Sequence, residues 1–241
     1  MTNVPLSPAE RVASVTVAIA TAVVIAAVAI VPFLTPAWVS FEQGRTGAAA
    51  LTGYSNADLD TATGAILHDL VLGPPTFAVA VNGQQVLNER ERAHMRDVRG
   101  VFGGFAVVAI ISLVVVVAGY AGAKRLGHPE RAWRAVRLGA RGLAVGVVVA
   151  GVVALVAFDT AFEIFHRLFF ASGSYTFDEG TERLVQLFPF TFWSETTIAV
   201  GGVILLLCLG VTIAVGRLTA KGEPRRDTTA SAAVAPSGVP R

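Results

Sequence analysis

Long uncharged, apolar stretches alternate with polar segments along this chain, and they set its expected architecture. Four stretches lack Asp, Glu, Lys and Arg, and they cover residues 14–34, 101–123, 142–158 and 196–216. Each approaches the length of about 20 residues that a helix needs to cross a bilayer. Lipid offers the backbone no hydrogen-bond partner, so spanning segments of this kind are helices. We therefore expect an all-α membrane protein built on a bundle of four transmembrane helices.

The composition excludes an ordinary soluble enzyme. Hydrophobic residues make up 54% of the 241-residue chain and charged residues 15%, against a charged share of about 25% in soluble domains. Four buried helices would need a polar shell that the rest of the chain is too short to supply. The first stretch also exceeds the roughly 7–15 apolar residues of a secretory signal core, so we interpret it as an uncleaved anchor. A net charge of +2 indicates no nucleic-acid partner.

Basic residues near the span ends predict the orientation, because cytoplasmic loops are enriched in Lys and Arg. The connection between the second and third stretches holds six basic residues and one acid, Glu130; the basic residues are Lys124, Arg125, Arg131, Arg134, Arg137 and Arg141. This connection and both termini should therefore lie in the cytoplasm. The long first and third connections should lie outside, as expected for a multi-pass membrane protein.

The predicted organisation has eight parts. An N-terminal cytoplasmic stub and first span (1–34) precede the first extracytoplasmic loop (35–100), the second span (101–123) and a basic cytoplasmic loop (124–141). The third span (142–162) reaches past Asp159 and precedes the second extracytoplasmic loop (163–195), the fourth span (196–216) and a tail (217–241). The tail is rich in Ala, Pro, Ser, Thr and Arg and is expected to be disordered and cytoplasmic.

The outer loops should form a small α+β cap. Apolar residues at helical spacing predict a helix over residues 60–72. Residues 77–81 and 84–87 flank Asn82-Gly83, the pair that suits a tight hairpin turn. A helix should start near Asn88 and run into the second span, and a short helix should cover residues 181–188.

Two histidines at the outer ends of membrane helices are the candidate functional residues. His94 follows Glu91 and precedes Asp97 by three residues each, which places all three on or near one helix face. His166 follows Asp159 and Glu163 at spacings of seven and three, again on one face. Imidazoles titrate near neutral pH and commonly act as acids, bases or metal ligands.

Three chemistries could use these histidines. Both sites contain Glu-x-x-His, the spacing by which helix bundles hold di-iron or di-manganese centres. Alternatively, His68, His94 and His166 could form a zinc site with an open position. Finally, one imidazole could act as a general base and the other as an acid or oxyanion donor, with a carboxylate orienting each ring.

The residues around these histidines resemble a known bacterial family, the lipoprotein intramolecular transacylases. The resemblance covers residues 12–215 at the level of four spans with long first and third loops. Matching residues are dense in two stretches, namely Glu91-x-x-His94-Met95-x-Asp97-Val98 in the first, and Phe158-Asp159, Phe162, Phe165-His166, Phe169-Phe170, Leu184-x-Gln186-Leu187-Phe188-Pro189 and Phe192-Trp193 in the second.

The resemblance implies an acyltransferase that acts on diacylglyceryl lipoproteins within the membrane. Such an enzyme moves the acyl chain at the glycerol 2-position onto the α-amine of the N-terminal cysteine and yields a lyso-form lipoprotein. It needs no cofactor or metal, and no obligate protein partner is expected. The family's two histidines correspond to His94 and His166.

We expect His94 to be the base and His166 to donate a proton to the oxyanion or the leaving oxygen, with the reverse assignment open. Supporting carboxylates would orient the rings, Glu91 or Asp97 for the first and Asp159 or Glu163 for the second. The alternative is a non-catalytic membrane protein that binds lipid or a partner.

Overall fold

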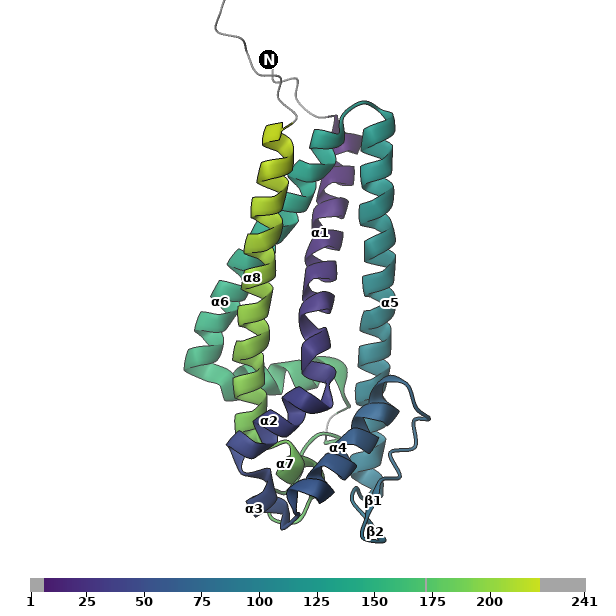
Figure 1. The fold of residues 1–241 in the computed structure, drawn as a ribbon, viewed down its shortest axis with the longest axis vertical. Coiled ribbons are helices and arrows are strands. Elements are labelled where there is room, and N and C mark those ends of the chain that lie inside the picture. The colour runs from purple at the N-terminus through teal and green to yellow at the C-terminus, as the bar shows by residue number, and fades with distance from the viewer. Residues whose placement is uncertain (1–6, 172, 222–241) are drawn as a thin grey trace, which may run out of the picture.

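The computed structural model describes residues 7–171 and 173–221 and shows a helical bundle with a cap at one end (Figure 1). Four helices are long and apolar enough to cross a membrane, and their candidate spans are Pro8–Leu34, Glu89–Arg125, Pro129–Val153 and Phe190–Ala220. The expected all-α membrane fold with four spans is thus confirmed. The expected tail from residue 222 onward lies outside the described residues, but residues 217–221 still belong to the last helix.

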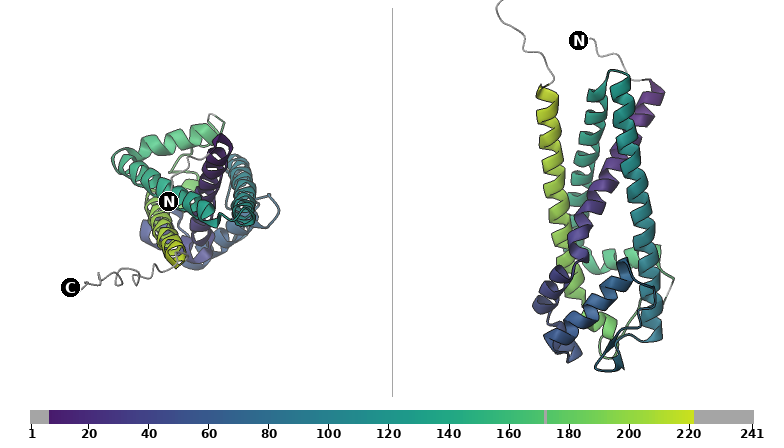
Figure 2. Two further views of the ribbon diagram at one scale, coloured as in Figure 1. Left: turned by 90° about the horizontal axis from the view of Figure 1, so that it is seen from above. Right: turned by 45° about the vertical axis from the view of Figure 1, so that its right-hand side comes forward.

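The bundle consists of α1 (Pro8–Ile30), α5 (Glu89–Arg125), α6 (Pro129–Phe169) and α8 (Phe190–Lys221). The N-terminal end of α1, the connection from α5 to α6 and the end of α8 all lie at one end of the bundle (Figures 1 and 2). The two long connections lie together at the other end, as the sequence predicted. Which end faces the cytoplasm remains a prediction.

Close helix contact in the bundle depends on small residues. A Cβ atom added to Gly139 of α6 would lie 2.2 Å from the backbone oxygen of Ala18 in α1, so only glycine fits at this crossing. The bundle core contains five buried residues from three helices, namely Ile25, Ala29, Ala140, Ile204 and Cys208. Small residues let membrane helices approach closely where lipid removes the hydrophobic drive for association.

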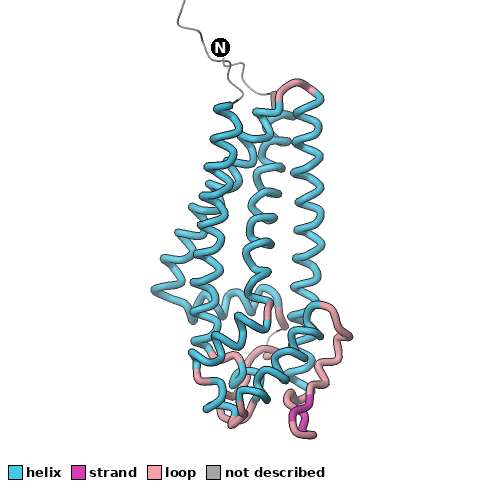
Figure 3. The backbone as a smooth tube through the Cα atoms, viewed as in Figure 1, coloured by secondary structure: helices cyan, strands magenta, loops and turns pink. Residues whose placement is uncertain are grey.

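The cap is built mainly from the first loop. It contains a 3₁₀ turn η1 (Val31–Leu34), helices α2 (Pro36–Thr46), α3 (Ala48–Thr52) and α4 (Asn56–Val71), the two-residue strands β1 (Ala80–Val81) and β2 (Gln84–Gln85), and α7 (Arg183–Leu187) from the second outer loop. Figure 3 shows how small the strand content is. The helix expected over residues 60–72 starts earlier, at Asn56, because Ser55 and Asp58 form a capping box.

The predicted hairpin is present but short. β1 pairs with β2 in antiparallel register, Ala80 opposite Gln85 and Val81 opposite Gln84. Asn82 and Gly83 both have positive φ, 52° and 76°, as the predicted type of turn requires. Helices α2 and α3 were not predicted from the sequence.

The cap has its own hydrophobic core, which joins both outer loops. Its most buried side chains, at most 1% exposed, are Phe77, Ile66, Leu87 and Leu187. They belong to one cluster with residues of α2, α4, α5 and α7. The start of α5 is therefore fixed against a folded domain before it enters the membrane.

The third span differs from expectation at its outer end. Helix α6 is interrupted at Ala157, where φ is −147° and ψ is 51°, outside the helical region. Beyond this break, residues 158–169 form a helical segment that turns from the bundle axis and runs across toward α5 (Figures 1 and 2). The predicted extension of the span through residue 162 is therefore wrong, because the helix changes direction before Asp159. We call residues 158–169 the cross segment.

Candidate active site

The fold brings the two predicted histidines together. His94, in the second turn of α5, and His166, in the cross segment, have ring centroids 6.2 Å apart and ring planes inclined by 19°. Both are largely buried, with exposed fractions of 7% and 9%. A group of atoms between or beside the rings could reach a nitrogen of each, which acid and base catalysis on one substrate requires.

Aromatic rings enclose the pair. Phe170 contacts both imidazoles, with centroid distances of 4.8 Å to His94 and 5.5 Å to His166. Phe177 packs on His94 at 5.4 Å, while Phe162 and Tyr175 pack on His166 at 4.1 Å and 5.0 Å. None of these three residues, Phe170, Tyr175 and Phe177, was predicted from the sequence to line the site. The immediate surroundings of the two imidazoles are therefore mainly aromatic.

The hydrogen bond of His166 fixes its tautomer. Its Nδ1 lies 2.8 Å from the backbone oxygen of Phe162, and a carbonyl oxygen can only accept. Nδ1 therefore carries the hydrogen, and Nε2 of the neutral ring keeps its lone pair. Neither Asp159 nor Glu163 makes this bond: Asp159 is exposed, and Glu163 accepts from Arg167 and Tyr175.

His94 has a different environment. Its Nδ1 is buried and has no hydrogen-bond partner within the described residues, a state that costs about 1–3 kcal/mol when nothing binds. Burial and a second imidazole 6.2 Å away both oppose a positive charge on this ring. His94 is therefore suited to act as a neutral ring that binds a polar atom of a ligand.

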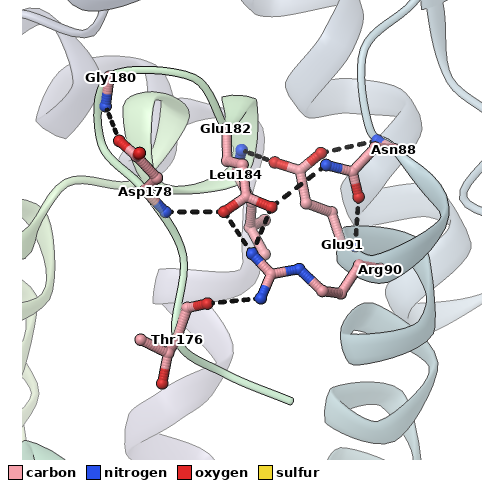
Figure 4. Close-up of polar contacts among 8 residues, drawn as sticks. All are labelled: Asn88, Arg90, Glu91, Thr176, Asp178, Gly180, Glu182 and Leu184. Carbon is pink, nitrogen blue, oxygen red and sulfur yellow. Dashed lines mark hydrogen bonds and ion pairs between the residues drawn. The ribbon is translucent and has the colours of Figure 1, made fainter. Parts of the chain in front are cut away.

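The expected ring-orienting role of Glu91 and Asp97 is not seen. Glu91 is 1% exposed, and its carboxylate accepts instead from the backbone N–H groups of Asn88, at 2.7 Å, and Leu184, at 2.6 Å (Figure 4). Asp97 is exposed. The bond to Asn88 has a local reason: the first N–H groups of a helix lack helical partners, and Glu91 occupies the capping-box position three residues after Asn88. The bond to Leu184 forms because the second outer loop packs against the start of α5.

A second buried carboxylate, Glu182, adds to the contacts of Glu91 at the start of α5. We call Glu91 and Glu182, with the groups that donate to them, the polar anchor. Glu182 accepts two hydrogen bonds from Arg90, at 2.5 and 2.6 Å, and one from the backbone N–H of Asp178, at 2.7 Å (Figure 4). Arg90 also donates to the backbone oxygen of Thr176 and lies over the ring of Phe177, 4.9 Å from its centroid. These contacts hold the second outer loop, with Phe177, against the start of α5.

The metal hypotheses gain no support from the geometry. Within residues 7–171 and 173–221, no three His, Cys, Asp or Glu side chains are grouped so as to hold a metal ion. His68, which the zinc hypothesis requires, has a side chain that is 61% exposed and pairs with Asp69 in the cap.

Comparisons with known proteins agree on one family. The family model described as "Lipoprotein intramolecular transacylase Lit" matches residues 13–193. Among solved structures, the membrane-integral lipoprotein intramolecular transacylase Lit from Bacillus cereus is similar at a TM-score of 0.73 and 16% identity, over 89% of this chain and 99% of that one. Two further Bacillus cereus Lit structures, in which a histidine is replaced by arginine or by alanine, have TM-scores of 0.71, identities of 15% and 16%, the same 89% coverage of this chain, and coverage of 95% and 96% of theirs. No curated protein matches the chain.

Proposed function

Since the chain belongs to the lipoprotein intramolecular transacylase family, we propose that it moves the acyl chain at the glycerol 2-position of a diacylglyceryl lipoprotein to the α-amine of the N-terminal cysteine. Family membership supports the general activity, transacylation of a lipoprotein in the membrane. The observation that supports the detailed reaction is the approach of His94 and His166 to 6.2 Å within an aromatic enclosure.

His166 is the base in this proposal. Its Nε2 holds a lone pair because Nδ1–H is bonded to Phe162, so Nε2 can take a proton from the attacking α-amine. The amine nitrogen forms a bond to the ester carbonyl carbon, and the bond from that carbon to the glycerol oxygen breaks. The protonated His166 returns its proton to the leaving oxygen, which becomes the free hydroxyl of the lyso-form product.

His94 stabilises the transition state. A neutral imidazole whose Nδ1 carries the hydrogen can donate to the oxyanion that forms on the ester carbonyl. The buried Nδ1 of His94, for which the described part of the chain supplies no hydrogen-bond partner, supports this role. The assignment reverses the roles that we favoured from the sequence, because the hydrogen bond of His166 became visible only in the fold. Both reacting groups belong to one molecule, so the protein supplies orientation and needs no external acyl donor.

The proposed reaction also implies which end of the bundle faces the outside of the cell. The start of α5 and the cross segment, which carry the histidines, lie with the cap at one end of the bundle (Figure 1), and lipoproteins carry their lipid at the outer surface of the bacterial cell membrane. The basic α5–α6 connection at the other end indicates the cytoplasm.

The test uses purified protein and a defined diacylglyceryl lipopeptide. The product is an isomer of the substrate, so transfer is followed by loss of the free α-amine and by fragmentation in the mass spectrometer. His94→Ala and His166→Ala should each reduce kcat/KM by about 10²–10⁴-fold, while His68→Ala, a change at an exposed cap histidine, should have no effect.

Each variant must also elute and unfold like the unaltered protein. Full transfer by both histidine variants would refute the catalytic assignment. An absence of transfer by the unaltered protein, together with tight binding of the lipopeptide, would favour the non-catalytic alternative.

A further inference from the structure

A hollow of about 430 Å³ opens beside the imidazole pair, lined by Glu163, Arg167, Phe170, Gly173, Tyr175 and Thr176. Its volume lies within the range of about 300–1,000 Å³ that ligand sites occupy. Two of its wall residues, Phe170 and Tyr175, also contact the ring of His166, at 5.5 and 5.0 Å. The hollow and the candidate active site therefore share a wall.

The lining of this hollow is polar and charged, in contrast to the aromatic enclosure of the histidines. Arg167 and Glu163 form an ion pair at 2.7 Å, and their side chains are 72% and 45% exposed. Tyr175 adds a hydrogen bond from its hydroxyl to Glu163 at 3.2 Å. The hydrogen bond from Arg167 is the main reason that the pKa of Glu163 lies below its ordinary value, so both charges are present at neutral pH.

We infer that this hollow is the subsite for the polypeptide segment that follows the lipid-modified cysteine. The inference rests on the proposed function. The substrate joins two chemically different parts at the reacting atoms, apolar acyl chains and a polar peptide chain. Burying an acyl chain against an exposed ion pair would cost the hydration of both charges, whereas peptide N–H and C=O groups find partners there.

The ion pair makes the subsite sensitive to the charge of the peptide. In the unaltered protein each charge masks the other, so acidic and basic peptides are bound similarly. Arg167→Gln leaves the negative Glu163 without its partner and should favour peptides with Lys after the cysteine. Glu163→Gln leaves the positive Arg167 and should favour peptides with Asp there. Opposite shifts from two neighbouring residues are the signature of a charge facing the peptide.

The experiment compares two diacylglyceryl lipopeptides that differ only in Lys or Asp at the two positions after the cysteine. The measured quantity is the ratio of their kcat/KM values, because a general loss of activity cancels in it. We expect the ratio to move about threefold toward the basic peptide in Arg167→Gln and about threefold toward the acidic peptide in Glu163→Gln, the scale of an exposed ionic interaction. Salt at about 0.5 M should reduce both shifts.

The matched control is a second exposed ion pair that does not line the hollow. Arg45 of α2 and Glu195 of α8 lie 2.9 Å apart, with side chains 54% and 41% exposed. Arg45→Gln and Glu195→Gln change the net charge of the protein in the same way, and they should leave the ratio unchanged.

Transfer with a ratio that stays constant in both hollow variants would overturn the subsite, as would equal shifts in the control variants. The proposed function fails in a different way, since no lipopeptide would then be transferred by the unaltered protein.

Discussion

The two imidazoles belong to segments that are anchored by different forces. His94 lies at the start of α5, where Glu91 and Glu182 are buried and accept hydrogen bonds from the backbone and Arg90. His166 lies on the cross segment, which is held mainly by ring contacts and by the side chain of Tyr175, whose hydroxyl donates to Glu163. One half of the pair is thus fixed by polar groups that tolerate little change. The other half is fixed mainly by the packing of aromatic rings.

Glu91→Ala should have the largest effect. The substitution removes the charged acceptor of two backbone N–H groups, that of Asn88 in a part-buried hydrogen bond and that of Leu184 in a buried one, and each such bond contributes about 1.5–3 kcal/mol. We expect the free energy of unfolding to fall by about 3 kcal/mol or more, with loss of transfer. Thermal unfolding in detergent measures the change.

The control for this variant is Glu89→Ala, since the Glu89 side chain is 67% exposed and should contribute less than about 0.5 kcal/mol. Equal melting temperatures for the two variants would show that the polar anchor does not hold the start of α5.

Glu42→Gln should have a smaller effect on the stability of the fold, and this effect should depend on pH. Glu42 is a buried carboxyl of the cap, but within the described part of the chain it lacks the backbone N–H donors that Glu91 has, so the variant tests how such a carboxyl affects stability. Glu42 is 1% exposed; burial, followed by the neighbouring Glu195, raises its pKa from 4.5 to about 7, although Arg45 opposes the shift. The folded state thus holds the proton more tightly than the unfolded chain, and stability is lost as the pH rises from about 4.5 through about 7.

The measurement is the melting temperature at pH 5 and pH 8. Glu42→Gln carries no titrating group, so its melting temperature should fall less between these pH values than that of the unaltered protein. An identical fall in both proteins would contradict the assignment.

Tyr175→Phe should have the smallest effect. It removes the hydroxyl bonded to the exposed carboxylate of Glu163 but keeps the ring that packs on His166, so we expect a loss of about 0.5 kcal/mol and an almost unchanged kcat/KM. Tyr175→Ala removes the ring as well and should lower kcat/KM several-fold. An equal loss of kcat/KM from Phe and from Ala would mean that the hydrogen bond of the hydroxyl, and not packing of the ring, positions His166.

The spans could be predicted from the sequence because lipid imposes a simple rule, a long helix without charges. Helices α2 and α3 were missed although signals for them exist. Thr35 caps α2 and Pro36 follows at its first position, while Gly47 and Gly53, with φ of 74° and 72°, end α2 and α3. These capping signals enclose short helices whose apolar residues show no clear periodicity.

The site could be predicted only in part. Residue spacing placed each histidine on a face with carboxylates, but it could not show that Glu91 would bond to Leu184, 93 residues away. Nor did it show the break at Ala157, since residues 152–160 contain neither Gly nor Pro, the usual causes of a kink. The long-range contacts that decide hydrogen-bond partners arise only when the outer loops fold together.

The close crossing of α1 and α6 at Gly139 has a consequence for chemistry at the far end of the bundle. From Gly139 to the break at Ala157, α6 extends about 27 Å as a stiff rod. A rotation of about 2° around the crossing would displace the far end of this lever by about 1 Å. About 1 Å of misplacement can cost on the order of a hundredfold in rate. A methyl group added at Gly139 would therefore lower the rate of transfer by displacing His166, although it does not contact this residue.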